Sequence, residues 1–520
     1  MEELAQINGI ISSVIYRNDE NGYAVLRLEQ DNGEMTTVVG CFPYAAPGEM
    51  VMADGTWMTH AQHGRQFKAE HSSRLLPTNA DSIYEYLAGG TVRGVGPATA
   101  ALIVERFGDK SLDMLEMHPE KIAEIKGIGE SKAKSICKSF KHQSGVRRLM
   151  EFLCSYNIQP VFALRLYKFY GDSALEVVNE NPYILASAHI GASFAEADAL
   201  ALDLGIEGDS INRVAAAVTF ELLHNSGNGH CFIPRDKLVM ATAQLINVQP
   251  DNVEEAIETL RESCEIICDE VAGLEACYLT EHYDAETYTA KRIKAMSKTK
   301  MPEDIDIESL INRAEKSAGI TYAPMQKKTL ELALDNQMIV ITGGPGTGKT
   351  TIVKAILQMF DEIGLDTCLA APTGRAAKRM TELTGREAST IHRLLDAKLS
   401  EDGESVVFGK DADDPLNCDA LILDECSMVD ITLMKSLLRA MRLECRLVLV
   451  GDADQLPSVG PGNVFSDIIR SEIVPTIRLT EIFRQNGDSV IVRNAHMINR
   501  GEYPDLGENA GDFFRLKRLN

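Results

Sequence analysis

Residues 341–351 read Ile-Thr-Gly-Gly-Pro-Gly-Thr-Gly-Lys-Thr-Thr, which contains the complete pattern G-x-x-x-x-G-K-S/T. The apolar run at 337–342 predicts a buried parallel strand, and residues 352–360 have helical spacing. Strand, glycine loop and helix in this order are the context in which the pattern holds the phosphates of a nucleoside triphosphate. The glycines let backbone N–H groups turn toward phosphate, and the helix N-terminus adds its positive end.

The loop residues themselves are the candidate phosphate ligands. They are Gly343, Gly344, Pro345, Gly346, Thr347, Gly348, Lys349, Thr350 and Thr351. Lys349 is expected to reach the β- and γ-phosphates, and the Thr350 hydroxyl is expected to ligate Mg²⁺. A chance match on a turn is the alternative, and the strand and helix signals on either side argue against it.

The composition is that of a soluble multidomain protein. A length of 520 residues predicts roughly three or four domains, and 45% hydrophobic with 25% charged residues is ordinary for globular chains. No run approaches the roughly 18–20 apolar residues of a membrane span, and the N-terminus lacks a signal-peptide pattern. Eleven scattered cysteines, with no second pair at a metal-ligand spacing after Cys264 and Cys268, predict reduced structural thiols. We therefore predict a cytoplasmic protein with no membrane partner.

The net charge of −24 argues weakly against nucleic-acid binding, because such domains usually carry basic patches. A local basic groove decides binding, however, and the global sum does not. Much of the acid is dispersed or lies in loops such as 401–404 and 411–414. The charge alone therefore does not exclude a nucleic-acid partner.

The first half of the chain changes its pattern once. Residues 1–76 alternate in short strand-like runs with turn signals, which predicts a small β-barrel or sandwich. Residues 80–205 have helical periodicity instead. We expect a small β domain followed by a helical domain.

The second half changes its pattern twice. Residues 211–285 mix helices with a short strand pair at 265–268 and 277–279, and residues 286–320 predict a charged helical linker. From about residue 321, strands alternate with helices, which is the sign of a parallel α/β domain. The glycine loop lies in this last domain.

One internal repeat lies in the helical region. Residues 91–101 and 124–134 share the form apolar-x-Gly-apolar-Gly-x-x-x-Ala, which resembles the helix-hairpin-helix motif. Its paired glycines, here Gly94, Gly96, Gly127 and Gly129, allow a tight hairpin whose N–H groups can meet a DNA phosphate without reading sequence. A looser relative at 189–198 lacks the second glycine. Alternatively, these hairpins only pack helices together.

A pair of carboxylates ends another apolar run, at 421–428. Asp424 is placed to hold the magnesium ion through water, and Glu425 is placed to orient or deprotonate an attacking water. Acid pairs at strand ends are sometimes only helix caps. The glycine loop earlier in the chain favours the catalytic interpretation.

Three further polar residues are candidates for the nucleotide. In the strand and loop at 446–462, Gln455 is placed to contact the γ-phosphate, with Asp452 orienting the loop. Arg484 is a candidate for stabilising charge on the transferred phosphoryl group. Gln326, just before the first strand, could read an adenine edge with its paired donor and acceptor.

A basic loop follows the strand that begins at residue 369. Thr373 and Arg375 lie in it, and Arg393 lies in a second segment at 390–395. All three side chains could face phosphates of single-stranded DNA. Ordinary helix capping and solvated charge are the alternative.

Six segments occur in the order GGPGTGKTT, APTGRAAK, TIHRLL, LDECSMVD, GDADQLPSVGPGNVF and LTEIFRQ. Together they resemble the ordered motifs of superfamily-one helicases, and most closely those of the RecD-like DNA helicases in their long stand-alone form. The resemblance implies an ATP- and Mg²⁺-dependent enzyme that moves 5′ to 3′ on single-stranded DNA and unwinds duplex. It implies single-stranded DNA and single-strand/duplex junctions as partners, with DNA-repair or recombination proteins as further candidates, and a monomer.

The resemblance also implies roles for individual residues. Gln326 becomes the adenine-recognition glutamine, and Lys349 with Thr350 binds phosphate and magnesium. Asp424 and Glu425 become the metal and water carboxylates. The two remaining roles are the coupling glutamine, Gln455, and the arginine from the region that joins two motor lobes, Arg484.

By the same resemblance the chain divides into five segments. They are a small OB-like β domain at 1–76, a helical domain with helix-hairpin-helix repeats at 77–205, a winged-helix-like region with a linker at 206–320, a RecA-like ATPase lobe at 321–500 and the start of a second lobe at 501–520. In the family, that second lobe carries a further ATP-contacting arginine. We therefore expect a truncated chain that binds ATP, is a candidate to bind DNA and unwinds little.

Two rival interpretations belong to other classes. A relaxase fused to a helicase would need a histidine cluster and nucleophilic tyrosines near the N-terminus, where His60 and His63 are isolated. A non-enzymatic DNA-binding adaptor that keeps a nucleotide-sensing lobe stays open. Single-turnover ATPase measurements with and without single-stranded DNA would separate it from a motor.

Overall fold

The computed structural model describes residues 5–18, 22–30, 32–60, 64–89, 92–299, 306–344, 346–399, 406–481, 490–499, 501–506 and 512–513. The described chain forms two compact units, the first ending at Ala217 and the second beginning at Val218. Within these ranges, no helix has the length and apolar character needed to cross a membrane.

The first unit begins with a closed barrel of five strands in the order β1-β2-β3-β5-β4. The strands are β1 (Ala5–Arg17), β2 (Tyr23–Glu29), β3 (Met35–Cys41), β4 (Met50–His60) and β5 (Gly64–Leu75). Alternate residues point inward, as in β2, where Ala24, Leu26 and Leu28 are fully buried. The predicted small β domain is therefore a barrel.

Helices make up the rest of the first unit, as predicted. They are α1 (Ala80–Ala88), α2 (Pro97–Phe107), α3 (Ser111–Met117), α4 (Pro119–Ala123), α5 (Glu130–Ser155), α6 (Val161–Tyr170), α7 (Ala174–Glu180) and α8 (Phe194–Asp203), with 3₁₀ turns at Gly108–Lys110, Gly171–Ser173 and Pro182–Ala186. A buried carboxylate joins barrel and helices: Glu49 pairs with Arg74 of β5 at 3.1 Å and with Arg147 of α5 at 3.0 Å.

The second unit begins within α9 (Ile211–Ser226). The next elements are β6 (Phe232–Pro234), α10 (Arg235–Ile246), α11 (Pro250–Glu262), β7 (Ile266–Val271) and β8 (Leu274–Leu279). The strands form an antiparallel sheet in the order β6-β8-β7, a winged-helix-like arrangement. The pair β7–β8 corresponds to the predicted strand pair, whereas the three-residue β6 was not predicted.

Two helices occupy the range predicted as a linker. They are α12 (Thr280–Met296) and α13 (Ile307–Ala318). Ile293 and Met296 of α12 are buried in the same core as the strands of the α/β domain. Arg292 donates to the carbonyl oxygens of Met441 and Arg442, at 3.1 and 2.8 Å. The described part of the range is mostly helical, as predicted, and α12 packs against the α/β domain.

A six-stranded parallel sheet in the order β11-β10-β14-β15-β9-β16 forms the α/β domain. Its strands are β9 (Met338–Gly343), β10 (Thr367–Ala371), β11 (Ser389–Thr390), β14 (Ala420–Leu423), β15 (Arg446–Gly451) and β16 (Thr476–Leu479). The other elements are α14 (Pro324–Asp335), α15 (Lys349–Glu362), α16 (Gly374–Thr384), α17 (Ile391–Leu394), the hairpin β12 (Ala397–Leu399) and β13 (Val406–Phe408), a 3₁₀ turn at Cys426–Met428, α18 (Ile431–Ala440), α19 (Val464–Ser471) and α20 (Val490–Asn499). The predicted parallel α/β fold is confirmed.

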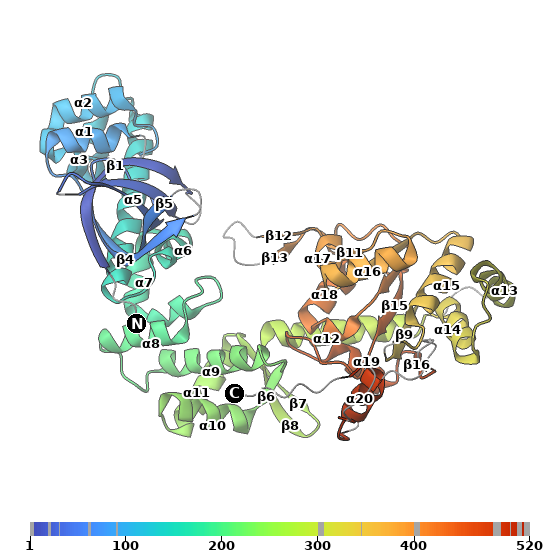
Figure 1. Ribbon diagram of the computed structural model, residues 1–520. Coiled ribbons are helices and arrows are strands. Elements are labelled where there is room, and N and C mark those ends of the chain that lie inside the picture. Colours follow the sequence, from blue (N-terminus) through green and yellow to red (C-terminus); the bar gives the residue numbers. More distant parts are fainter. Residues whose placement is uncertain are drawn as a thin grey trace. The chain divides into compact units, whose positions relative to one another are not determined.

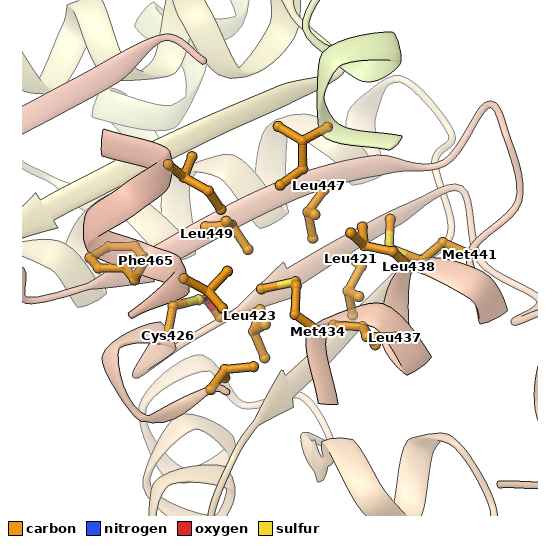
Figure 2. Packing of buried hydrophobic residues seen from close by; sticks show 14 of the residues in the cluster. Leu421, Leu423, Cys426, Met434, Leu437, Leu438, Met441, Leu447, Leu449 and Phe465 are labelled. Carbon is orange, nitrogen blue, oxygen red and sulfur yellow. Dashed lines mark hydrogen bonds between the residues drawn. The ribbon is translucent and has the colours of Figure 1, made fainter. Parts of the chain in front are cut away.

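Both faces of this sheet are buried, which explains the continuous apolar runs in its strands. Alternate residues of β9, β14 and β15 face α13, α14 and α15 on one side and α12, α18 and α19 on the other. In Figure 1, α13 to α15 lie to the right of the strands and α18 lies to the left. Figure 2 shows Leu421 and Leu423 of β14 directed toward Met434 and Leu437 of α18. This packing fixes the strand ends from which the site is built.

Candidate nucleotide and DNA sites

The glycine loop joins β9 directly to α15, and its backbone explains its glycines. Gly346 and Gly348 have φ of +83° and +85°, a region that side chains other than glycine rarely adopt. At Gly343, a Cβ atom would stand 2.7 Å from the carbonyl oxygen of Leu479 on the neighbouring strand β16. Pro345 lies outside the described residues.

Lys349 bends back over the loop. Its ammonium donates to the carbonyl oxygens of Gly343 and of Gly344, the latter at 3.2 Å. The Thr347 hydroxyl also donates to the Gly344 oxygen, at 2.9 Å. Thr350 and Thr351 follow in the first turn of α15. A cation held only by carbonyl oxygens can exchange them for the stronger, charged acceptors of a phosphate.

A cavity of about 310 Å³ opens above the loop. The predicted residues that line it are Gly344, Gly346, Thr347, Gly348, Lys349, Thr350, Asp424, Glu425 and Gln455. They come from three separate stretches of sequence, which meet because β9, β15 and β14 are neighbouring parallel strands ending at one edge of the sheet. The structure thus brings the loop, both carboxylates and the candidate coupling glutamine together.

The two carboxylates share one electrostatic environment. Burial raises the pKa of Asp424, although the Glu425 backbone N–H donates to its Oδ1 atom at 2.9 Å and opposes that shift. Burial also raises the pKa of Glu425, and the neighbouring Asp424 charge adds to that rise. Lys349 and Arg379 lower both pKa values. A further cation beside the pair would therefore stabilise the ionised form of both carboxylates.

Gln455 lies in a loop that hydrogen bonds hold at its start. The Ser427 hydroxyl donates to Gln455 Oε1 at 3.3 Å. Asp452 is buried, and its Oδ1 atom accepts the Asp454 N–H at 3.1 Å. The Ala453 N–H donates to the Thr342 hydroxyl of β9, also at 3.1 Å. The start of this loop is therefore tied to the strand that carries the glycine loop.

Two predicted nucleotide residues are not brought into this cavity. Gln326 is buried, and its Oε1 atom accepts the Ala323 N–H at 3.0 Å, capping the start of α14. Its amide group is the part left for a base edge. Arg484 lies outside the described residues. Both roles stay predictions.

The predicted single-strand contacts lie on α16 and α17. Thr373 caps α16, accepting the Ala376 N–H at 3.2 Å, and Arg375 is exposed in its first turn. Arg393 is exposed on α17 and pairs with Glu387 at 3.4 Å. Capping and solvated charge, the alternative weighed for these residues, are thus present, and the DNA role stays a prediction.

Several residues of the cavity were not predicted from the sequence. They are Val353, Ala376, Arg379, Met380, Leu383, Thr384 and Val450. Arg379 is the chemically important one among them. No sequence signal singles it out, because helical periodicity places both residue 378 and residue 379 one turn beyond Arg375.

In each of the two hairpins, the first glycine makes the turn and the second precedes the helix. Gly94 and Gly127 have φ of +90° and +102° and make the turns. Gly96 and Gly129 cap α2 and α5, and no atom lies within 4 Å of the Cβ that either would carry. Their helix N-termini are therefore open to an approaching phosphate.

The two hairpins also lie against each other. Lys132, three residues after the second glycine of its repeat, donates to the hydroxyl of Thr99, the equivalent position of the other repeat, at 3.2 Å. Both open helix N-termini therefore belong to one surface of the first unit. The looser repeat differs, because Ser193 and Glu196 form a capping box that occupies the start of α8.

Four family models match the chain. The N-terminal one, an ATP-dependent DNA helicase YrrC OB-fold domain, matches residues 4–77, and a SAM-like helix-hairpin-helix tandem matches 87–142. An ATP-dependent RecD2 DNA helicase HHH domain matches 142–232, and an AAA domain matches 326–461. Together they cover barrel, hairpins and α/β domain.

One relative aligns along nearly the whole chain. The ATP-dependent RecD2 DNA helicase of Deinococcus radiodurans is 31% identical over 532 residues, which cover 99% of this chain and 72% of the relative. The chain belongs to the RecD2 helicase family. The predicted fold class, the RecD-like family and the enzyme class of ATP-dependent helicases are confirmed.

Other relatives match shorter parts of this RecD2 family member. The RecBCD enzyme subunit RecD of Mycobacterium tuberculosis is 40% identical over 167 residues, 28% of each protein. The ATP-dependent DNA helicase dda of Enterobacteria phage T4 is 36% identical over 178 residues, 33% of this chain and 40% of dda. The chain thus spans less than half of these two relatives.

Proposed function

We propose that this chain acts as an ATP-dependent DNA helicase that moves 5′ to 3′ along single-stranded DNA and unwinds duplex ahead of it. The observation that carries the proposal is the cavity in which the glycine loop, two carboxylates and Gln455 meet. Family membership supports the helicase chemistry, and the direction of movement rests on the resemblance of the motor motifs.

In this proposal, Lys349 exchanges the carbonyl oxygens of Gly343 and Gly344 for the β- and γ-phosphates. The Thr350 hydroxyl and the Asp424 carboxylate supply hard oxygen ligands, which suit Mg²⁺. Both groups line the same cavity. When bound, Mg²⁺ would neutralise charge on the β- and γ-phosphate oxygens.

Glu425 is proposed to orient the attacking water and accept its proton. Its raised pKa makes it a stronger base than an exposed glutamate. Gln455 would contact the γ-phosphate and respond to its loss, through the loop that Ser427 and Asp452 hold in place. Gln326 and Arg484 would contact the adenine and the transferred phosphoryl group.

DNA is proposed to bind at two places. The open helix N-termini at Gly96 and Gly129 would meet phosphates without reading sequence. Thr373, Arg375 and Arg393 would follow a single strand over the α/β domain. The Arg393–Glu387 pair is exposed on both sides, so exchanging it for a phosphate costs little.

Strand displacement from tailed duplexes tests the proposal. In a form of the protein that includes a second motor lobe, the expected result is ATP-dependent displacement from a 5′ single-stranded tail, none from a 3′ tail, and loss of displacement in Lys349→Ala. Displacement from the 3′ tail alone would contradict the direction. ATP and DNA binding without displacement would favour the second candidate, a DNA-binding protein with a nucleotide-sensing lobe.

A further inference from the structure

The loop that carries Gln455 is fastened at its far end to the winged-helix-like region. The Gly462 N–H donates to the carbonyl oxygen of Gly229 at 3.0 Å. Gly229 lies in the turn between α9 and β6, more than two hundred residues earlier in the chain. One residue before Gly462, the Pro461 oxygen accepts the Ile431 N–H of α18 at 2.9 Å.

The fit at this joint is close. Gly462 has a φ of +89°, and a Cβ atom there would stand 3.1 Å from the Cys231 Sγ atom and 3.2 Å from the Ile431 Cβ atom. Cys231 and Ile431 are buried in the same core as the sheet. The turn at 229–231 and the end of the loop are therefore in direct contact, with no side chain between them.

Between its two fastened ends, the loop has exposed apolar side chains and one buried polar one: the Ser458 hydroxyl lies within hydrogen-bond distance of the carbonyl oxygens of Gly462 and Gly460, at 2.8 and 3.1 Å. Leu456 and Val459 expose 86% and 87% of their surface, although both are apolar. A cavity of about 380 Å³ adjoins the joint, lined by Asn225 and Lys237 on one side and by Asn463 and Asp467 on the other. Because Ser458 links the loop to Gly462 and a cavity adjoins the joint, a movement of Gln455 can reach the joint.

We propose that the turn at 229–231 anchors the end of the loop that carries Gln455 and thereby positions this glutamine. Through the same contact, the change between bound ATP and bound ADP is transmitted to the winged-helix-like region. The inference rests on the proposed role of Gln455 as the γ-phosphate contact. The proposed contact would couple the winged-helix-like region to the nucleotide bound in the α/β domain. Gly229, Cys231 and Gly462 are positioning residues, because none of them lines the nucleotide cavity.

The variants follow from the fit. Gly462→Ala pushes a methyl group against Cys231 and Ile431, and Cys231→Ala in the same chain removes the contact with the sulfur atom but leaves the one with Ile431. Gly364→Ala is the matched control, since Gly364 also has a positive φ, of +78°, with no atom within 4 Å of its Cβ position. Both single variants share the backbone strain, and only Gly462→Ala disturbs the joint.

The first measurement is nucleotide discrimination, the ratio of the dissociation constants for ADP and a slowly hydrolysed ATP analogue. Gly462→Ala should reduce this ratio about fivefold, the size expected when one net hydrogen bond is lost. Gly364→Ala should leave it unchanged, and the double variant Gly462→Ala/Cys231→Ala should recover part of it, since the contact with Ile431 remains. Equal ratios in wild type and Gly462→Ala would overturn the inference.

The second measurement is hydrogen exchange on the wild-type chain. Amides in 225–234 and 456–463 should exchange differently with the ATP analogue than with ADP. Unchanged exchange in 225–234, while the analogue protects 343–351, would overturn the inference and leave the nucleotide site standing. No protection of 343–351 would overturn the proposed function and the inference together.

Discussion

At the scale of single residues, Arg379 is a second cation in the nucleotide cavity. Arg379 lines the cavity from α16 and Lys349 lines it from α15, and Arg379 lowers the pKa of both Asp424 and Glu425. Among the described residues, no hydrogen bond or ion pair engages it. A triphosphate in this cavity would lie near both a lysine and an arginine.

Arg379→Gln should therefore weaken binding of ATP more than binding of ADP. The expected loss for ATP is about tenfold, the order of one charge-assisted hydrogen bond. Lys378→Gln is the control, because Lys378 is exposed on the same helix and does not line the cavity. Titration with fluorescent nucleotides measures both. Equal effects on ATP and ADP would show that Arg379 does not contact the γ-phosphate.

The ionised Glu425 side chain is expected to lower the stability of the ligand-free protein. Its folded pKa lies above the usual 4.5, so its ionisation destabilises the fold, and stability falls as pH rises from 4.5 through the folded pKa. Glu425→Gln should thus raise the thermal unfolding midpoint at neutral pH, with the gain vanishing as pH falls toward 4.5. The measurement is a melting series over pH. A variant that melts below wild type at neutral pH would refute this assignment.

At the scale of elements, substitutions at the N-termini of α2 and α5 test whether the hairpins bind DNA or only pack helices together. Gly96→Ser and Gly129→Ser would give α2 and α5 the side-chain cap that Ser193 gives α8. A serine cap satisfies the helix N–H groups and so competes with phosphate. The double variant should melt no lower than wild type but bind duplex DNA several-fold more weakly at low salt.

The reverse change is the control for this experiment. Ser193→Gly should lower the melting temperature slightly, because the capping box of α8 is lost. It should leave DNA affinity unchanged, since that helix start is already closed. Unchanged DNA binding in the Gly96→Ser/Gly129→Ser variant would argue that the hairpins only pack helices.

The sequence predicts elements best where local pattern and burial agree. The alternation in β2 and the apolar runs of β9, β14 and β15 are visible in the chain, because each strand faces one or two buried layers. The three-residue β6 is too short for any period to show. The packing of α12 against α18 depends on residues about 150 positions apart, which no local pattern encodes.

The site was predictable to the same extent. Asp424 and Glu425 follow a buried strand directly, and Lys349 follows another after the glycine loop, so their meeting at one sheet edge could be inferred from a parallel fold. Arg379 and the Gly229–Gly462 joint could not be inferred, because they depend on how a helix side and a distant turn pack. Thr373 and Gln326 cap helices, and their contacts with DNA and with adenine stay predictions.

At the scale of the whole molecule, the two units contain different elements and different hydrophobic cores. The first holds the barrel and hairpins, and the second holds the winged-helix-like region and the nucleotide cavity. In the first unit, Glu49 is fully buried between Arg74 and Arg147, and Arg74 also donates to the Pro43 oxygen at 2.7 Å. This cluster holds the barrel and α5 together.

Glu49→Ala should destabilise the first unit by about 3–5 kcal/mol, because it leaves two buried guanidinium groups without their carboxylate. Denaturant unfolding, with limited proteolysis as the readout for the first unit, measures this loss of stability. Glu130→Ala, which removes the exposed partner of Lys134, should cost less than about 1 kcal/mol. Nucleotide affinity should stay at the wild-type value in both. A loss of nucleotide binding in Glu49→Ala would show that the two units do not fold independently.

The central claim is that the loop at 343–351 and the carboxylates across the cavity form one MgATP site. Calorimetric titration of ATP with Mg²⁺ into wild type, Lys349→Ala and Glu425→Gln tests it most directly. The account predicts binding in wild type and Glu425→Gln, at least about tenfold weaker binding in Lys349→Ala, and hydrolysis stimulated by single-stranded DNA in wild type alone. Wild-type affinity in Lys349→Ala, or wild-type hydrolysis in Glu425→Gln, would contradict it.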